Sequence, residues 1–453
     1  MTQAAPRPAQ AAAALDEHQT VQRLRAAIRA AVPSCDSHSL ANLAWAHAET
    51  ALGPADLPSL LLERLLALRG VAEDREVANV VRLCALDTRD RVDERSVRTL
   101  LVLLQPRLAT WHSHALAVLA WALATLGVAN KGTFAAIAGA ALECRDALTP
   151  RTASSLAWAF ARTGHHHSRK EVALFARVAD EILAHATADA APLHHYAASP
   201  QDVSNLLWAF ATAGDGARRA GSEGRARWPR ERADRLCSAL VTQFAADAAR
   251  AGDVGLANAA WAAAELGLYD PRFMHAVLRR AADLTPALSL HAAAVLVWAC
   301  GRLGHRHDAA TSVLADAAAV HLSRAAAPPH ARSLSMLLHG FATAGLGDSA
   351  AVQRCARLAV GALAADAAAL PEQALANACW ALAALGLHVE RPHMERLIAE
   401  AFSRGSAFKL AELSQLAQAN LALLLEAPWY RPAFSSCDAH AFLRALYVLG
   451  AAR

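Results

Sequence analysis

The stretch "SSLAWAFARTG" at residues 154–164 decides the fold, because it recurs along the chain with few changes. Its copies read "ANLAWAHAETALG" at 41–53, "AVLAWALATLG" at 117–127, "SNLLWAFATAG" at 204–214, "ANAAWAAAELG" at 257–267, "AVLVWACGRLG" at 294–304, "SMLLHGFATAG" at 335–345 and "ANACWALAALG" at 376–386. A segment that occurs many times at regular spacing is a structural repeat and not a unique site.

One marker position defines the period of this repeat. It is occupied by Trp45, Arg82, Trp121, Trp158, Trp208, Trp261, Trp298, His339, Trp380 and Gln418, of which Arg82 and Gln418 belong to degenerate copies. Most markers follow one another at about 38 residues, which predicts an all-α fold: an α-solenoid superhelix of about ten helix-turn-helix repeats over residues 34–453. Residues 1–33 are expected to be an N-terminal extension, partly disordered or forming a capping helix.

The composition favours closely packed helices. Hydrophobic residues make up 55% of the chain but aromatic residues only 6%, and the abundant alanine is the best helix former. No apolar run reaches the roughly 18 residues that cross a bilayer, so we expect no membrane insertion. The eight cysteines are scattered without close pairs. This predicts buried thiols, for example at Cys300 and Cys379, and not a zinc site.

Each repeat is predicted to contain a helix A, which carries the marker, and a helix B. Proline after a capping residue, as in Thr149-Pro150, suits the first turn of helix A. Glycine six residues after the marker is expected to end helix A in a left-handed conformation. These glycines are Gly127, Gly164, Gly214, Gly267, Gly304, Gly345 and Gly386. Helix B follows, for example over 168–186 and 393–405.

A helical wheel divides helix A into three faces. Positions −5, −2, +2 and +5 from the marker are apolar, for example Val203, Leu206 and Phe210, and should pack on helix B. Positions −4, +1 and +3 are mostly alanine, glycine or serine, which would let neighbouring A helices pass closely. The third face, at positions −7, −3 and +4, carries varied polar side chains. We call this face the polar ladder.

The polar ladder supplies most of the candidate binding residues. They are Arg75, Asn79, His114, Arg151, Arg162, Asn205, Asn258, His291, Arg302, Arg332 and Asn377. The marker tryptophans lie on the same face. Two interpretations of them stay open: they fill the grooves between adjacent A helices, or they offer stacking platforms to nucleobases.

Two insertions stretch the spacing between markers to 50 and 53 residues. The first lies near 186–200. The second, near 215–232, gathers arginines around one tryptophan, a composition typical of RNA-contacting loops but equally of a solvated loop. Its candidate residues are Arg218, Arg219, Arg225, Arg227 and Trp228.

The string "L-A-N-L-x-W-A-x-A-x-L-G" in units of about 38 residues resembles the octotricopeptide repeats of organellar RNA-binding proteins. Related helical repeats occur in FAST-kinase-type and RAP-domain proteins. The resemblance covers roughly 38–453 and implies a solenoid that binds single-stranded RNA in mitochondria or plastids, in transcript stability, processing, splicing or translation. A RAP domain is not seen, because only 35 residues follow Gln418 and they contain no strand pattern.

The leading functional interpretation is therefore binding of single-stranded RNA, and the alternative is a protein-binding scaffold, for example in an organellar ribosome or an assembly complex. The net charge of +4 favours nucleic acid only weakly. We expect no enzymatic activity and no cofactor, since nucleotide-binding and hydrolase motifs are absent. The histidine runs after Gly164 and Gly304 are expected to be turns and not metal sites.

Overall fold

The computed structural model describes residues 19–68, 72–87, 92–184, 198–219, 228–285, 287–324, 329–387, 390–404 and 407–430, with backbone alone at 215–219. Every regular element within these ranges is an α-helix or a short 3₁₀-helix, and no strand occurs in them. The chain divides into two compact units, residues 1–240 and 241–453. In each unit the helices pack in series, which confirms the predicted all-α solenoid of helix pairs.

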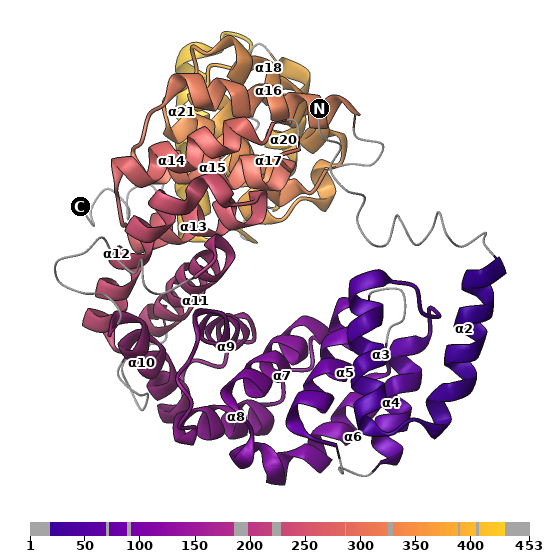
Figure 1. The fold of residues 1–453 in the computed structure, drawn as a ribbon. Helices are drawn as coiled ribbons and strands as arrows, with labels where there is room; N and C mark the ends of the chain where they lie inside the picture. The colour runs from indigo at the N-terminus through magenta and orange to yellow at the C-terminus, as the bar shows by residue number, and fades with distance from the viewer. Residues whose placement is uncertain are drawn as a thin grey trace. The chain divides into compact units, whose positions relative to one another are not determined.

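Unit 1 contains two rows of helices. The A helices are α3 (Ser37–Thr50), α5 (Asp74–Leu86), α7 (Ser113–Leu126), α9 (Pro150–Arg162) and α11 (Pro200–Arg219). The B helices are α4 (Leu57–Ala67), α6 (Glu94–Leu104), α8 (Lys131–Glu143) and α10 (Arg169–Leu183), and α12 (Arg230–Asp247) begins in this unit. Figure 1 shows α3, α5, α7 and α9 side by side on the inner side of the unit and α4, α6 and α8 on its outer side.

Unit 2 repeats this arrangement. Its A helices are α13 (Asp253–Leu266), α15 (Leu290–Leu303), α17 (Ala331–Thr343), α19 (Glu372–Ala384) and α21 (Leu410–Glu426). Its B helices are α14 (Pro271–Asp283), α16 (Asp308–Arg324), α18 (Ala350–Ala365) and α20 (Arg391–Arg404). Each A helix contacts the next A helix, and each B helix contacts the next B helix.

The N-terminal extension contains one helix, α2 (Gln19–Ala31), followed by a 3₁₀ turn over Val32–Ser34. No residue of α2 is buried. The helix is held by polar contacts: Arg29 pairs with Asp56 at 2.7 Å, and the Arg25 side chain donates to the Leu52 carbonyl oxygen. Residues 1–18 lie outside the described part of the chain.

Most predicted helix ends are confirmed. The Thr149 hydroxyl accepts a hydrogen bond from the Thr152 amide and caps α9. Left-handed glycines end the A helices at Gly127, Gly164, Gly267, Gly304, Gly345 and Gly386. The prediction was wrong at Gly214, because α11 continues to Arg219. A Cβ atom at Gly214 would lie 3.6 Å from the Trp228 indole nitrogen, an ordinary packing distance, so Gly214 lies beside this ring and does not end the helix.

The apolar and small faces of helix A pack as the wheel predicts. Phe210 is buried and meets Phe175 of α10 edge to face, with ring centroids 5.3 Å apart. The small flanks bring A helices into close contact: a Cβ atom at Gly340 of α17 would lie 2.6 Å from the backbone nitrogen of Trp298 in α15. The last described A helix differs, because its +3 position is Leu421, 58% exposed, where every other repeat has alanine or glycine.

A second recurrent feature, which sequence reasoning missed, ties helix B to the start of its own repeat. A basic side chain in or just after helix B donates to a backbone carbonyl oxygen shortly before helix A. These pairs are Arg64 to Cys35, Arg107 to Ala72, Arg177 to Cys144, Arg280 to Ala251, His321 to Leu288 and Arg404 to Leu370. We call them the loop-binding residues. They satisfy carbonyl groups that would otherwise be unpaired in the connecting loops.

Candidate nucleic-acid interface

The polar ladder is solvent-accessible in both units. The candidate residues at position −7, namely Arg75, His114, Arg151, His291 and Arg332, are all exposed. The asparagines at position −3, namely Asn79, Asn205, Asn258 and Asn377, are half-buried, and Arg162 and Arg302 at position +4 are exposed. In each unit these residues all belong to the A helices, which lie side by side in one row.

Positive charge accumulates on this face of unit 1. Partial desolvation of the His114 ring lowers its pKa, and the charges of Arg151, Arg75 and Arg82 lower it further. These arginines belong to the two repeats on either side of that of His114: Arg75 and Arg82 to the one before it and Arg151 to the one after it. Charges of neighbouring repeats therefore act on this one imidazole, with Asp74 raising its pKa against the three arginines.

Unit 2 has a smaller basic cluster of the same kind. Desolvation is the largest cause of the lowered pKa of His291, and Arg332 and His330 of the next repeat add to it. The His291 Nδ1 atom lies 3.1 Å from the Ser333 hydroxyl, which holds the ring against α17. Arg302 stands at the opposite end of the same helix α15.

The arginines of the ladder differ in their partners from the arginines among the loop-binding residues. Within the described residues, the guanidinium groups of Arg75, Arg151, Arg302 and Arg332 form no hydrogen bond or ion pair with the protein. Arg162 lies over the Trp158 ring, 5.8 Å from its centroid. The arginines among the loop-binding residues, by contrast, donate to backbone carbonyl groups, as Arg177 does to Cys144 at 2.9 Å. Exposed arginines without such a partner also occur on the B helices within the described residues, for example Arg169, Arg235 and Arg279.

Amide side chains link parts of the ladder. Gln201 donates to the Asn205 side-chain oxygen at 2.8 Å within α11, and Gln415 of α21 donates to the Asn377 side-chain oxygen of α19 at 2.9 Å. Asn258 forms no hydrogen bond with described side chains, so its amide remains available. An amide can serve either as a link between repeats or as a donor and acceptor for a base edge.

Acidic groups interrupt the ladder at its first two repeats. Glu49 lies 3.9 Å from Arg82, and Glu76 lies 3.7 Å from His38. Burial opposes the charge of Asp74, but hydrogen bonds from the His112 amide and ring lower its pKa overall. The stretch around α3 and α5 is therefore mixed in charge, whereas Arg151 and Arg162 on α9 have no acidic partner.

The marker side chains form a row along the A helices. The Trp158 and Trp208 ring centroids lie 6.3 Å apart, and those of His339 and Trp380 lie 5.1 Å apart. The Trp380 indole nitrogen donates to the Gln418 side-chain oxygen at 2.9 Å. These half-buried markers touch the next marker, as the groove-filling interpretation requires. Trp45 differs, because 57% of it is exposed.

The second insertion contributes little that can be described. Arg225 and Arg227 lie outside the described residues, and so do the side chains of Arg218 and Arg219. Trp228 is not the loop aromatic that the sequence suggested. It is half-buried, with its ring centroid 5.2 Å from Phe175 and 6.0 Å from Phe210, and it therefore packs on the hydrophobic core of unit 1.

The histidine run after Gly164 is a structural turn, as predicted. The His165 ring stacks on Phe134 with centroids 4.6 Å apart, and its Nδ1 atom lies 3.5 Å from Glu171. Burial lowers the pKa of His166 to about 4, with a further contribution from His167. Among the described residues, no three metal-ligating side chains lie close enough to share an ion.

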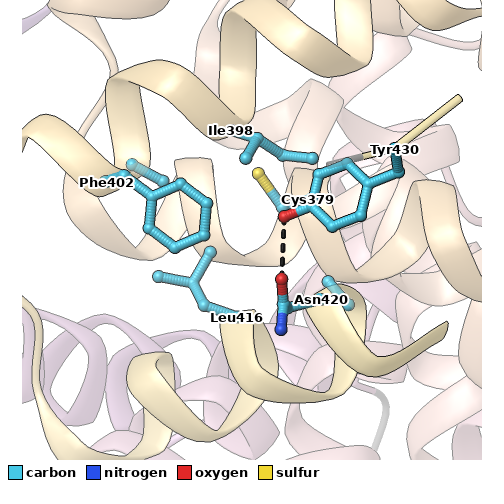
Figure 2. A pocket seen from close by; sticks show the side chains of 8 residues that line it. Cys379, Ile398, Phe402, Leu416, Asn420 and Tyr430 are labelled. Carbon is cyan, nitrogen blue, oxygen red and sulfur yellow. Dashed lines mark hydrogen bonds between the residues drawn. The ribbon is translucent and has the colours of Figure 1, made fainter. Parts of the chain in front are cut away.

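A small pocket lies between α19, α20 and α21, with Tyr430 at its edge (Figure 2). The Tyr430 hydroxyl donates to the Asn420 side-chain oxygen at 2.7 Å, and Ile398, Phe402 and Leu416 line the rest. Burial raises the pKa of Cys379 to about 12, so its thiol stays protonated and unreactive. This pocket is a gap in the core and offers no chemistry to a ligand.

Comparisons with known proteins give no functional assignment. No family model and no curated protein matches the chain. A solved structure titled "Homology model of the full-length AP-3 complex in an intermediate open conformation" is similar over 96% of this chain and 85% of that chain, with 12% identity and a TM-score of 0.37. Similarity at this level supports no argument about partners. Within the described residues, no helix is long and apolar enough to span a membrane.

Proposed function

We propose that the polar ladder binds single-stranded RNA. The observation that supports this function is a set of exposed arginines along the A helices: Arg75, Arg151, Arg302 and Arg332 have guanidinium groups with no partner in the described protein. Arg75 and Arg151 lie two repeats apart in unit 1, and Arg302 and Arg332 lie on adjacent repeats in unit 2, and exposed guanidinium groups are typical phosphate-binding groups. Half-buried amides on the same rows, at Asn79, Asn205, Asn258 and Asn377, supply groups for base edges.

A single strand suits this surface better than a duplex. Repeat proteins can present one or a few side chains per repeat to each successive base, and this requires bases that are not paired. The row of A helices in each unit presents basic groups at −7 in some repeats and amides at −3 in others, with half-buried markers along the same row. The resemblance to octotricopeptide repeats adds the proposal that the targets are mitochondrial or plastid transcripts.

The test compares two variants of equal charge. The ladder variant carries Arg75→Gln, Arg151→Gln and Arg332→Gln. The control variant carries Arg169→Gln, Arg235→Gln and Arg279→Gln, three exposed arginines on B helices. Affinity for RNA selected from a randomised single-stranded pool is measured by fluorescence anisotropy at several salt concentrations. Loss of three phosphate contacts should flatten the slope of log affinity against log salt by roughly 2, since each contact on a single strand contributes about 0.7.

The control variant should keep the wild-type slope. Equal losses in both variants would show that binding follows net charge and not the ladder. Selection of no RNA above background would overturn the proposal and leave the protein-binding scaffold as the function to pursue. The organellar part of the proposal is tested by capturing the protein from isolated mitochondria or plastids and asking whether RNA is bound to it.

A further inference from the structure

Trp45 on α3 is the marker of the first repeat, and it departs from the other markers in its exposure. Its exposed fraction is 57%, whereas Trp121, Trp158, Trp208, Trp261, Trp298 and Trp380 are all half-buried. The backbone around it is an ordinary helix A, with Leu40 and Ala44 fully buried on the faces toward the core. The exposure therefore belongs to the side chain and its neighbours and not to a loosened helix.

The identity of the next marker explains why Trp45 is uncovered. Trp158 is flanked by Trp208, and Trp380 contacts both His339 and Gln418. After Trp45 the next marker is Arg82, whose guanidinium group turns to Glu49 at 3.9 Å. Within the described residues, the Trp45 indole has no aromatic, cationic or hydrogen-bonding partner. The apolar surface of the Trp45 indole is therefore exposed to water, whereas neighbouring side chains partly cover the tryptophan markers of the other repeats. This exposure is unfavourable in proportion to the apolar area.

Amide side chains occupy position −3 of both the first and the second repeat, and neither forms a hydrogen bond with the described residues. Asn42, one turn before Trp45 on the same face of α3, is exposed. Asn79 occupies the matching position of α5 and is half-buried. An aromatic ring beside amide groups is the combination that binds a nucleobase, because the ring stacks on the base face while an amide bonds to the base edge.

The charges nearby favour a base over a phosphate at this position. Glu49 and Glu76 place two carboxylates on α3 and α5, one paired with Arg82 and one near His38. A phosphate would be repelled by these groups, whereas a neutral base would not. The unpartnered guanidinium group of Arg75 stands at the N-terminal end of α5, where it is free to meet the backbone of the strand.

We propose that Trp45, Asn42 and Asn79 form a subsite for one unpaired nucleobase, which stacks on the Trp45 indole. The inference rests on the proposed RNA-binding function and adds to it a named stacking position at the first repeat. Stacking on an aromatic ring accepts any base, so this subsite anchors the strand, and the amides supply whatever base preference it has.

The experiment uses the full chain and RNA selected from a randomised single-stranded pool. Trp45→Ala should weaken binding roughly 5- to 150-fold, the range of one lost stacking contact. Trp45→Phe should restore most of the affinity. The slope of log affinity against log salt should stay unchanged in both variants, because no phosphate contact is lost. Tyr269→Ala removes a 50% exposed aromatic side chain away from the ladder and should bind like wild type.

A second measurement on wild-type protein guards against a folding defect in the variant. RNA carrying 5-iodouridine is irradiated in the complex, and the crosslinked peptide is identified by mass spectrometry. A crosslink to Trp45 supports the subsite. Unchanged affinity of Trp45→Ala, or crosslinks only to other residues, overturns the subsite while the RNA-binding function stands. Absence of any RNA binding by wild type refutes the proposed function and the subsite together.

Discussion

Single glycines set how closely neighbouring A helices approach. Gly340 of α17 faces the backbone of α15, and a Cβ atom there would lie 2.6 Å from the Trp298 nitrogen and 2.7 Å from the Val297 carbonyl carbon. Backbone atoms cannot move aside as the end of a flexible side chain can. Any side chain at this position must therefore push two helices apart.

The first prediction follows from this contact. Gly340→Ala should lower the free energy of unfolding by about 1–3 kcal/mol, the usual effect of overpacking. Gly361→Ala is the matched control, because a Cβ atom there meets only the His393 ring at 3.8 Å. Removing a glycine from a helix interior should stabilise by up to about 1 kcal/mol. Chemical denaturation of both variants measures the two effects, and destabilisation of equal size would refute the argument from close approach.

A second prediction concerns acid. His166 is 6% exposed, and burial lowers its pKa from 6.5 to about 4. Between pH 6.5 and pH 4, His166 is therefore protonated in the unfolded chain but neutral in the folded chain. The free energy of unfolding must fall as the pH falls through this window. Between pH 7 and pH 5 the loss should be about 2 kcal/mol.

His166→Asn should remove this part of the pH dependence, while His38→Asn, at an exposed position, should leave it intact. Denaturant titrations at pH 7 and pH 5 compare the three proteins. Above pH 5 the Glu171 carboxyl does not interfere, because its ordinary pKa is 4.5 and its hydrogen bonds lower the folded value, against the effect of burial, to about 2. A wild-type protein as stable at pH 5 as at pH 7 would contradict the prediction.

At the scale of the element, the loop-binding residues fix helix B against the start of helix A. Arg177 of α10 donates to the carbonyl oxygens of Ala141, Cys144 and Asp146 and pairs with Glu181. Its guanidinium group thus satisfies several acceptors of one loop at once. The helix pair of a repeat is held by this polar contact as well as by its apolar face.

The third prediction tests that contact. Arg177→Ala should lower the free energy of unfolding by about 2–3 kcal/mol, because partly buried carbonyl groups lose a charged donor. Arg169→Ala, in the first turn of the same helix α10 and exposed, should change it by less than about 0.5 kcal/mol. Thermal and denaturant unfolding of both variants provides the comparison. Similar small effects in both would show that the apolar face alone holds the repeat.

The sequence predicts helix A far better than helix B, and the reason is geometric. Helix A has a fixed marker, a fixed glycine and a strict order of faces, so its position follows from counting residues. The loop-binding residues lie between 19 residues after the marker, as Arg64 does after Trp45, and 25 residues after it, as Arg107 does after Arg82. Arg64, Arg177 and Arg280 share the spacing of 19, but the other three lie 23 to 25 residues after their markers, so the periodic signal covers only half of the set. The contact becomes recognisable only when the loops are placed in three dimensions.

At the scale of the whole chain, two structural features depend on tertiary packing that a repeat pattern does not contain. Gly214 matches the helix-ending glycines in sequence, but the Trp228 ring packs beside it and α11 continues past it. Trp228 itself, which the sequence suggests is part of a loop, packs against Phe210 of the core. The exposure of the ladder was predictable, because the faces of helix A are fixed by its period. Which arginines lack a partner was not, since that depends on loops and on neighbouring helices.

The last prediction concerns how far a local change spreads. Helices contact mainly the next helix of their own row and the partner in their own repeat, so stability should be a sum of local terms and not one cooperative block. Gly340→Ala should therefore raise amide hydrogen exchange in α15, α17 and α19, while α7 and α9 keep wild-type protection. Arg177→Ala should show the reverse pattern, with α8, α9 and α10 affected. Hydrogen exchange followed by mass spectrometry resolves these helices, and a uniform rise along the chain in either variant would mean that both units unfold together.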